Sequence, residues 1–431
     1  MSPAAGGTGL SPVQARGSGA VRVVRARSHI IEVVPPLIFR KGLDLREAVA
    51  GALAADYHSQ LVDRIREDGF RFASGRLTVH LAREFGFCYG VDRAVDYAYQ
   101  ARTRFADRRV FLTGEIIHNP QVNAKLRASG IRFLSDSHED RNSLTPDDVV
   151  IVPAFGVTVG DLAFFASRDC TLVDTTCGSV LNVWKNVERY ARDGFTAVIH
   201  GKVHHEETQA TASQALKYPG GRYLIVLDRE ETEVVCGYIR NGGTAAAFLD
   251  RFGGAVSSGF DPDRHLDRIG LANQTTMLMS ESLAIGEMFR AAMRDRYGEG
   301  ELPARYRAFD TICSATQERQ DAVIALLDQE ALDLMLVVGG YNSSNTRNLA
   351  NICAEQVPTY HIADPTCLLS AAEIRHRPVG ATTAGADGEV VGRHWLPPGP
   401  VAVGLTAGAS TPNNIVGEVV ERLQALTGAA A

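Results

Sequence analysis

The sequence has few cysteines, no long apolar run and no excess of charge of one sign. Its 431 residues contain 7 cysteines, an odd number, and none of them forms a CxxC pair. This pattern argues against a secreted disulfide framework, and we predict a reducing, cytoplasmic location. No apolar stretch approaches the ~18 residues that a membrane span needs. The net charge of −6 provides no basic field for nucleic acid or for anionic lipid.

The sequence also lacks the common nucleotide-binding and hydrolase signatures. It contains no GxxxxGK[ST], no GxGxxG and no GxSxG motif. Residues 1–31 contain arginines but no Asp or Glu, and they lack the apolar core of a secretory signal. We expect a disordered bacterial extension here in preference to an organelle-targeting segment.

What is present is a recurring pattern of an apolar strand, a polar loop and a helix. The strands of this pattern include Val149–Pro153, Ala197–His200, Leu334–Val338 and Val401–Leu405. Strands that alternate with helices predict an α/β fold with parallel sheets. Ligands bind such sheets at the carboxyl ends of the strands, so the polar loops are the places to look for chemistry.

The length and the pattern together predict an N-terminal extension and three α/β units. At about 150 residues per domain, the length favours two or three units. We expect an extension over residues 1–75 and units over residues 76–172, 173–308 and 309–431. The Gly-, Asp- and Arg-rich segment near 241–268 reads as an insertion in the second unit.

One cysteine in each predicted unit comes directly before a helical pattern. Cys88, Cys177 and Cys313 would each lie at the end of a strand and against a helix N-terminus. That position favours the thiolate, which is the form that binds metal or attacks a substrate. Three thiolates can hold a zinc ion or an iron–sulfur cluster, and the spacing does not choose between them. The remaining cysteines read as packed side chains: Cys170 and Cys236 in or beside strands, Cys353 in a helix, and Cys367.

Several polar loops have the composition of anion sites. Residues 339–346 (GGYNSSNT) and 406–412 (TAGASTP) each follow a strand and open a helix, where hydroxyls and free N–H groups can hold a phosphate. Ordinary helix capping explains either loop alone. His118 and the segment His204–Glu207 also follow strands, and they offer groups that pair with phosphate or move protons. The segment 272–276 (ANQTT) reads as a capping turn.

Taken together, the motifs resemble those of the 4-hydroxy-3-methylbut-2-enyl diphosphate reductases, in particular the plant and cyanobacterial branch. The resemblance runs from about residue 76 to 425. Its stretches are EFGFCYGVDRAV, GEIIHNPQVNAKL, VPAFGV, DTTCGSVLNVW, IHGKVHHEETQAT, ANQTTML, FDTICSATQERQDA, LMLVVGGYNSSNT and TAGASTPNNIV. It implies three α/β units around a pseudo-threefold axis, with a central [4Fe–4S] cluster held by Cys88, Cys177 and Cys313.

The resemblance also implies the reaction and its residues. The family reduces an allylic hydroxyl bound to the open iron and forms isopentenyl and dimethylallyl diphosphate, the last step of the methylerythritol phosphate route. Ferredoxin or flavodoxin is the implied electron donor. The implied catalytic residues are Glu207 as proton donor, Thr275 and His205. The implied substrate-binding residues are His118, His205, Thr276, Ser343, Ser344, Asn345 and Ser410.

Two positions depart from the family pattern. Phe155 replaces a histidine found in many bacterial members, which removes one diphosphate donor and fits the plant-like branch. Gly178 replaces a proline, and we expect it to loosen the turn beside Cys177. Three other interpretations stay open: a non-catalytic iron–sulfur sensor on the same fold, a cysteine hydrolase that uses Cys88 or Cys177 with His205, and a reductase of a related allylic diphosphate. The sequence leaves the oligomeric state open.

Overall fold

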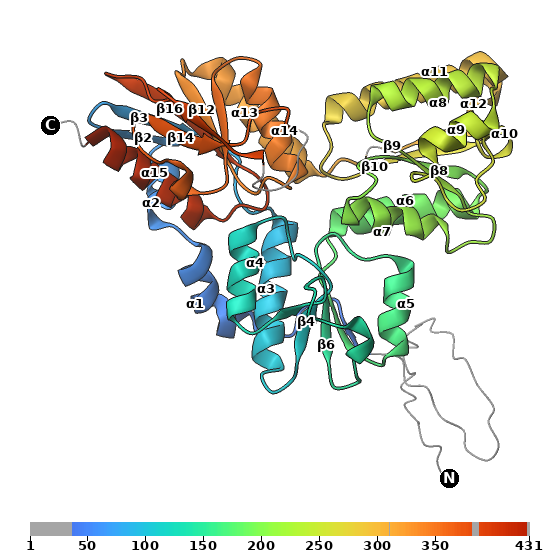
Figure 1. Ribbon diagram of the computed structural model, residues 1–431, viewed down its shortest axis with the longest axis horizontal. Helices are drawn as coiled ribbons and strands as arrows, with labels where there is room; N and C mark the ends of the chain where they lie inside the picture. Colours follow the sequence, from blue (N-terminus) through green and yellow to red (C-terminus); the bar gives the residue numbers. More distant parts are fainter. Residues whose placement is uncertain (1–36, 310, 382–387, 429–431) are drawn as a thin grey trace, which may run out of the picture.

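The protein folds into three lobes, each built around its own sheet (Figure 1). The computed structural model describes residues 37–309, 311–381 and 388–428. The predictions for residues 1–31 therefore lie outside the described ranges. The sheets are mainly parallel and helices cover them, so the predicted α/β fold with three parallel sheets is confirmed.

The first lobe contains a five-stranded parallel sheet with the strand order β1-β7-β6-β4-β5. Its strands are β1 (Ile38–Phe39), β4 (Val110–Leu112), β5 (Arg132–Phe133), β6 (Val149–Val152) and β7 (Thr171–Asp174). Its helices are α1 (Arg46–Tyr57), α3 (Tyr89–Arg104), α4 (Pro120–Ala128), the 3-10 turn η1 (Arg141–Ser143) and α5 (Val159–Ser167).

The second lobe contains a four-stranded parallel sheet with the strand order β11-β10-β8-β9. Its strands are β8 (Thr196–His200), β9 (Tyr223–Val226), β10 (Ile269–Asn273) and β11 (Tyr306–Ala308). Its helices are α6 (Gly178–Arg192), α7 (Glu206–Ala215), α8 (Arg229–Asn241), α9 (Ala245–Phe252), α10 (Pro262–His265), α11 (Met279–Tyr297), the 3-10 turn η2 (Glu299–Glu301) and α12 (Leu302–Arg305).

The third lobe contains a five-stranded sheet with the strand order β13-β12-β16-β3-β2, in which only the β2–β3 pair is antiparallel. Its strands are β2 (Arg71–Ser74), β3 (Leu77–Leu81), β12 (Leu334–Val338), β13 (Thr359–Ile362) and β16 (Val401–Ala407), with a separate hairpin of β14 (Glu373–His376) and β15 (Val390–Arg393). Its helices are α2 (Gln60–Glu67), α13 (Ser314–Gln329), α14 (Ser344–Ala354), the 3-10 turn η3 (Pro365–Cys367) and α15 (Asn413–Gly428).

Sheet membership differs from the predicted ranges on the N-terminal side. Strand β3, expected to open the unit over residues 76–172, pairs in parallel with β16 of the third lobe. The helices expected to belong to an extension are also built in, because Val62 and Ile65 of α2 lie in the core of the third lobe. Local apolar pattern identified β3 as a strand but carried no information on its partner, which lies more than 300 residues away.

Two other expectations differ from the structure. The segment near 241–268 is part of the second lobe's core, to which it contributes Phe248, Phe252, Phe260 and Leu266. The glycines and charged residues of this segment are typical of a surface insertion, and they gave no indication that its spaced aromatic side chains are buried. Cys236, expected in or beside a strand, lies buried in helix α8.

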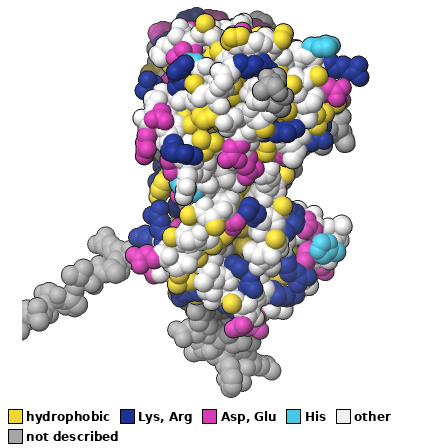
Figure 2. Space-filling model, turned by 90° about the vertical axis from the view of Figure 1, so that its left-hand side faces the viewer, with side chains coloured by type: hydrophobic (Ala, Val, Ile, Leu, Met, Phe, Trp, Pro, Cys, Tyr) yellow, Lys and Arg dark blue, Asp and Glu magenta, His cyan; other side chains and the backbone are white. Residues whose placement is uncertain are grey.

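The surface carries no continuous patch of one charge on the face that Figure 2 shows, where basic and acidic side chains are interspersed. This arrangement agrees with the small net charge of the sequence. Among the described helices, none combines the length and the apolar character that crossing a membrane requires.

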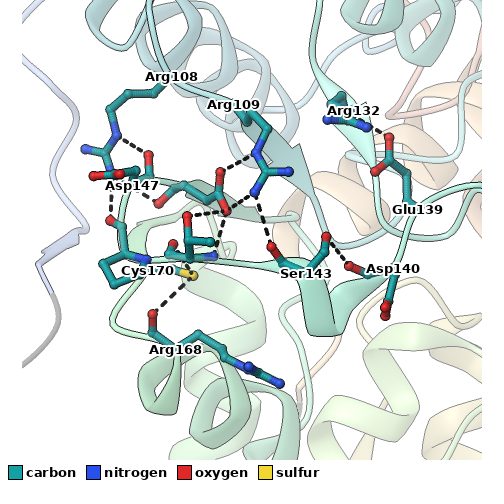
Figure 3. A network of polar contacts seen from close by, with 12 residues as sticks. Arg108, Arg109, Arg132, Glu139, Asp140, Ser143, Asp147, Arg168 and Cys170 are labelled. Carbon is teal, nitrogen blue, oxygen red and sulfur yellow. Dashed lines mark hydrogen bonds and ion pairs between the residues drawn. The ribbon is translucent and has the colours of Figure 1, made fainter.

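A polar network closes the amino-terminal edge of the first sheet, the edge away from the loops of interest (Figure 3). Arg109 donates two hydrogen bonds to the buried carboxylate of Asp148, at 2.7 and 2.6 Å, and the Thr145 N–H donates a third at 2.7 Å. Burial alone would raise the pKa of Asp148, but these hydrogen bonds outweigh it and lower that pKa. The network therefore stabilises the turn that precedes β6.

The network supports a stability prediction. We expect Asp148→Asn to reduce the free energy of unfolding by about 1–3 kcal/mol, because it breaks a hydrogen-bonded ion pair at a buried carboxylate. Chemical denaturation measures this change. The carboxylate stabilises the fold above its unfolded-state pKa, so the difference between variant and wild type should shrink as the pH falls below about 4.

The control for this prediction is Asp136→Asn, which breaks the more exposed pair with Arg127. That pair should contribute less than about 1 kcal/mol. Equal effects of the two substitutions would contradict the importance assigned to the buried pair.

Candidate functional site

The carboxyl ends of the three sheets meet at one cavity with about 660 Å³ of empty space. Its lining comes from loops that follow strands of all three lobes, as expected for ligand sites on parallel sheets. Every residue that the sequence analysis assigned to the site lines this cavity: Cys88, Cys177, Cys313, His118, His205, Glu207, Thr275, Thr276, Ser343, Ser344, Asn345 and Ser410. The fold thus brings together side chains that are up to about 320 residues apart in the sequence.

The three cysteines are held by a repeated backbone arrangement. Each is the N-cap of a helix: Cys88 of α3, Cys177 of α6 and Cys313 of α13. Each also donates its backbone N–H to a loop carbonyl of another lobe. These pairs are Cys88 with Ala409 (3.2 Å), Cys177 with Ala154 (3.0 Å) and Cys313 with Thr275 (3.3 Å). Helix α3 of the first lobe is thereby bonded to the third lobe, and α6 of the second lobe to the first. Helix α13 of the third lobe is bonded to the second, so the three contacts form a closed cycle.

The three thiols line one cavity without forming a group of ligand atoms that all lie within 4.8 Å of one another. Around tetrahedral Zn²⁺ with Zn–S near 2.3 Å, sulfur atoms lie about 3.8 Å apart. Among the described residues, the group whose ligand atoms all lie within 4.8 Å of one another is not the cysteine trio. Three thiols that line one cavity provide the number of protein ligands that an iron–sulfur cluster with one iron left open requires.

The thiols differ from the sequence expectation in their titration. Burial raises the pKa of Cys313 to about 11, although the Thr316 hydroxyl and N–H, at 3.0 and 3.3 Å, favour the thiolate. Burial also raises the pKa of Cys88. The expected stabilisation of the thiolate by helix N-termini is therefore outweighed by desolvation in the metal-free protein. Bound metal would reverse this balance.

Glu207 is a buried carboxyl that can carry a proton at neutral pH. It lies in the first turn of α7, is 2% exposed, and accepts hydrogen bonds from the Thr275 N–H (2.6 Å) and the Thr275 hydroxyl (3.0 Å). Burial raises the pKa of Glu207 to about 7, against the opposing effect of the Thr275 hydrogen bonds. A carboxyl with this pKa is suited to give a proton to a reacting group in the cavity.

A chain of hydrogen bonds fixes the protonation pattern of the two histidines. The Glu207 N–H donates to His205 Nδ1 at 3.1 Å, so the proton of neutral His205 resides on Nε2. Burial, followed by the proximity of His118 and Lys202, holds the pKa of His205 well below its usual value. His205 Nε2 lies 3.2 Å from His118 Nε2, while His118 Nδ1 donates to Glu115 Oε2 at 2.8 Å. In this arrangement the His205 Nε2–H donates to His118 Nε2 at the wall of the cavity.

The same contacts argue against a metal ion on the histidines. His118, His205 and Glu206 have ligand atoms within 4.8 Å of one another. A metal on His205 Nε2 would need the proton on Nδ1, where the Glu207 N–H already donates. The two imidazoles are instead held by hydrogen bonds to each other, to Glu115 and to the Glu207 N–H.

The polar loops also present donors to the cavity. Asn345 uses its Oδ1 to accept from the Ala409 N–H at 2.9 Å, and its buried Nδ2 has no hydrogen-bond partner. Ser343 caps α14 by accepting the Thr346 N–H, which leaves its hydroxyl hydrogen free to donate. Ser410 also lines the cavity, where its hydroxyl hydrogen is used to donate to the His118 carbonyl at 3.2 Å. A buried amide donor without a partner is costly unless a ligand completes it, so this wall is suited to an anion.

The two unusual positions have clear surroundings. Phe155 stacks on His118 with ring centroids 4.4 Å apart, and it meets His205 edge-on at 5.4 Å. Phe155 therefore orients both imidazoles. It cannot itself donate a hydrogen bond, as a histidine at this position would. Gly178 opens α6, and a Cβ there would meet no atom within 4 Å. Nothing in the packing requires glycine at that position.

Sequence reasoning missed two residues beside the cysteines. A Cβ on Gly90 would lie 2.5 Å from Cys177 Sγ, so only glycine lets α3 approach that thiol. Thr316 contacts Cys313 Sγ through both its hydroxyl and its N–H. The sequence could have indicated Thr316, because it is the third residue after the N-cap Cys313, and the N–H at that position bonds to a capping side chain. The Gly90 contact joins two lobes, so no pattern in the sequence around Gly90 predicts it.

The fold and the cavity define a class: an α/β protein of three lobes whose centre combines three thiols, a buried acid and a wall of anion donors. The chain belongs to the LytB protein family, whose model matches residues 79–424. This membership confirms the resemblance found in the motifs.

Cyanobacterial relatives match nearly the whole chain. A 4-hydroxy-3-methylbut-2-enyl diphosphate reductase of Gloeobacter violaceus is 48% identical over 90% of this chain and 93% of its own. The protein of the same name from Synechococcus sp. (strain RCC307) is 47% identical over 89% of this chain and 92% of its own.

Solved structures share the architecture. One is an (E)-4-hydroxy-3-methyl-but-2-enyl diphosphate reductase, the terminal enzyme of the non-mevalonate pathway. It is 25% identical, covers 80% of this chain and 99% of its own, and has a TM-score of 0.50. The E-1-hydroxy-2-methyl-but-2-enyl-4-diphosphate reductase of Plasmodium falciparum, 20% identical with a TM-score of 0.56, covers 80% of this chain and 86% of its own and supports the fold.

The contacts of Glu207 lead to a direct test of its titration. In Thr275→Val, the carboxylate loses the hydroxyl hydrogen bond that favours its charged form, so its titration should move upward by about one pH unit. Infrared difference spectroscopy follows the carbonyl band of the protonated carboxyl. The control is Thr276→Val, since the Thr276 hydroxyl contacts Gln274. An unchanged titration in Thr275→Val would contradict the assigned role of this hydrogen bond.

Proposed function

We propose that this protein reduces (E)-4-hydroxy-3-methylbut-2-enyl diphosphate to isopentenyl diphosphate and dimethylallyl diphosphate. The observation that carries the proposal is the single cavity that combines three thiols, a buried carboxyl with a pKa of about 7 and an unpartnered amide donor. The named relatives support the same substrate. Overall, one C–O bond breaks, one C–H bond forms, and two electrons and two protons are consumed as water leaves.

In this proposal Cys88, Cys177 and Cys313 hold a [4Fe–4S] cluster. When bound, such a cluster supplies an open iron as Lewis acid for the hydroxyl and a route for the electrons. The thiols are suited to this task because each is anchored to two lobes, at its helix cap and at its N–H.

The diphosphate binds, in this proposal, at the wall formed by the loops after β4, β8, β10, β12 and β16. Neutral donors and histidines at helix N-termini are suitable partners for several negative charges. Asn345 Nδ2 has no partner among the described residues, and a phosphate oxygen would complete it. His205 is a further proposed ligand, and its Nε2–H faces His118 Nε2 at 3.2 Å in the ligand-free cavity. The other proposed diphosphate ligands are His118, Thr276, Ser343, Ser344 and Ser410.

Glu207 donates the proton that lets the substrate hydroxyl leave as water. Thr275 holds the carboxyl through two hydrogen bonds, and the Cys313 N–H holds the Thr275 carbonyl, so the acid is positioned relative to a cysteine of the neighbouring lobe. His205 accepts the Glu207 N–H and thereby fixes the first turn of α7. Burial keeps water from competing for the proton.

The other interpretations are less well supported. A sensor without catalysis would not need a buried acid with a raised pKa, and it would not need a donor left free for an anion. A cysteine hydrolase needs an activated thiol, whereas burial raises the pKa of Cys88. A ferredoxin or flavodoxin remains the proposed electron donor, because the sequence contains no nicotinamide-binding motif. The cytoplasmic location stays a prediction.

An anaerobic assay tests the function. With reduced methyl viologen and the allylic diphosphate, we expect substrate-dependent viologen oxidation and the two five-carbon diphosphates. In Glu207→Gln, turnover should fall by at least about 100-fold while the cluster absorbance stays. Turnover of the wild type should decline as the pH rises through about 7, because Glu207 loses its proton.

The control for the acid is Glu188→Gln, since Glu188 pairs with Lys217 outside the cavity. It should retain wild-type turnover. A wild-type protein with about four irons per chain and no turnover would overturn the proposed reaction. Full turnover of Glu207→Gln would remove Glu207 from the mechanism.

The cluster assignment has its own test. Cys313→Ser should lose most of the iron and the visible absorbance after anaerobic reconstitution, because one of three ligands is gone. Cys353→Ser is the matched control, a buried thiol of the same lobe in helix α14. Iron and sulfide analysis gives the result, and unchanged iron content in Cys313→Ser would refute its role as ligand.

A further inference from the structure

Three cations beside the anion wall have no carboxylate partner within the described residues. Lys202 follows β8, Arg347 lies in the first turn of α14, and Arg377 follows β14. No ion pair within 4.0 Å involves any of them in the part of the chain that the structure describes, whereas the neighbouring Arg375 pairs with Glu389. Among the described residues, the Arg377 guanidinium, 1% exposed, donates to the carbonyls of Tyr341 and Ala381.

Burial and neighbouring positive charges lower the pKa of two of the three cations, Lys202 and Arg347. Burial, then Arg347 and Arg377, lower the pKa of Lys202 to about 8. Burial and Arg377 likewise lower the pKa of Arg347. A group of like charges in a half-buried position destabilises the protein on its own, and a bound polyanion offsets that cost.

Lys202 also makes one short contact with the cavity lining. Its ammonium donates to Ser344 Oγ at 2.7 Å, and Gln274 Nε2 donates to the same oxygen at 3.5 Å. An ammonium can only donate, so the Ser344 hydroxyl hydrogen must point elsewhere. Because Ser344 is 3% exposed and lines the cavity, that hydrogen is available to donate to a ligand bound there.

This contact also joins two lobes. Lys202 lies three residues before His205 on the loop of the second lobe, and its N–H donates to Gln274 Oε1 at 3.1 Å. Ser344 begins α14 of the third lobe. The ammonium therefore sets the distance between the two loops that form the proposed diphosphate wall.

We propose that Lys202 is a positioning residue for the diphosphate: it turns the Ser344 hydroxyl into a donor and, with Arg347 and Arg377, provides positive charge that the substrate neutralises. This inference rests on the proposed function, since it assigns a role at the same site. It adds a cationic component to a wall whose other members are neutral donors and histidines.

The test compares Lys202→Met and Lys202→Arg in the cluster-loaded holoenzyme. Calorimetry with inorganic pyrophosphate should show at least about 10-fold weaker binding in Lys202→Met, a loss of about 1.4 kcal/mol. KM for the allylic diphosphate should rise by a similar factor while kcat changes less than about two-fold, because the reacting atoms lie elsewhere. Lys202→Arg should recover most of the affinity, and iron content should be equal in all proteins.

A matched control and a second variant keep the test decisive. Lys217→Met removes a lysine that pairs with Glu188 in the same lobe and should bind pyrophosphate like the wild type. Should Lys202→Met fold poorly, Ser344→Ala tests the same contact, because it removes the hydroxyl and should weaken pyrophosphate binding. In the double variant the losses should not add, as expected for residues acting through one contact.

The outcomes separate this inference from the proposed function. A wild type that reduces the substrate while Lys202→Met and Ser344→Ala bind pyrophosphate normally would overturn the role of Lys202 and leave the reaction standing. A wild type that binds pyrophosphate through Lys202 but does not reduce the substrate would overturn the reaction alone. A fall in kcat equal to that in kcat/KM would also contradict a role in positioning the diphosphate.

Discussion

The cyclic set of backbone hydrogen bonds at Cys88, Cys177 and Cys313 is the constraint on which the site depends. Each cysteine caps a helix of one lobe and donates its N–H to a loop of another. The three thiols are therefore located by the contacts between lobes and not by any single lobe. The helix N-termini alone would direct thiols to the end of a sheet, but they would not bring the three to a common cavity.

The balance of desolvation and hydrogen bonding at Glu207 shows why the cavity has to be closed. Its carboxyl receives two hydrogen bonds from Thr275, which favour the charged form, yet burial prevails and the pKa rises to about 7. A more open cavity would hydrate the carboxylate and return it to an ordinary acid. The same burial leaves Asn345 Nδ2 without a partner, so the acid and the anion donors depend on one property of the cavity.

The sequence predicted the parts of the site that depend on local chemistry. Strand, loop and helix order placed Cys88, Cys313 and Ser343 at helix N-termini, where the structure has them as capping residues. It did not predict features set by distant partners. The pairing of β3 with β16, the approach of Gly90 to Cys177 and the contact of Lys202 with Ser344 each join segments far apart in the chain. Desolvation of the thiols also depends on the whole fold and reversed the expected effect of the helix ends.

The pairing of β3 with β16 has a consequence for biosynthesis. Leu77 lies beside Val401, so the third sheet cannot close until nearly the entire chain has left the ribosome. The first two lobes contain their own sheets and can fold earlier, N-terminal parts first. Cys88, whose N–H is held by Ala409, stays without its anchor during that time. The complete set of three anchored thiols therefore forms only after Ala409 has been synthesised, later than the partners that anchor Cys177 and Cys313.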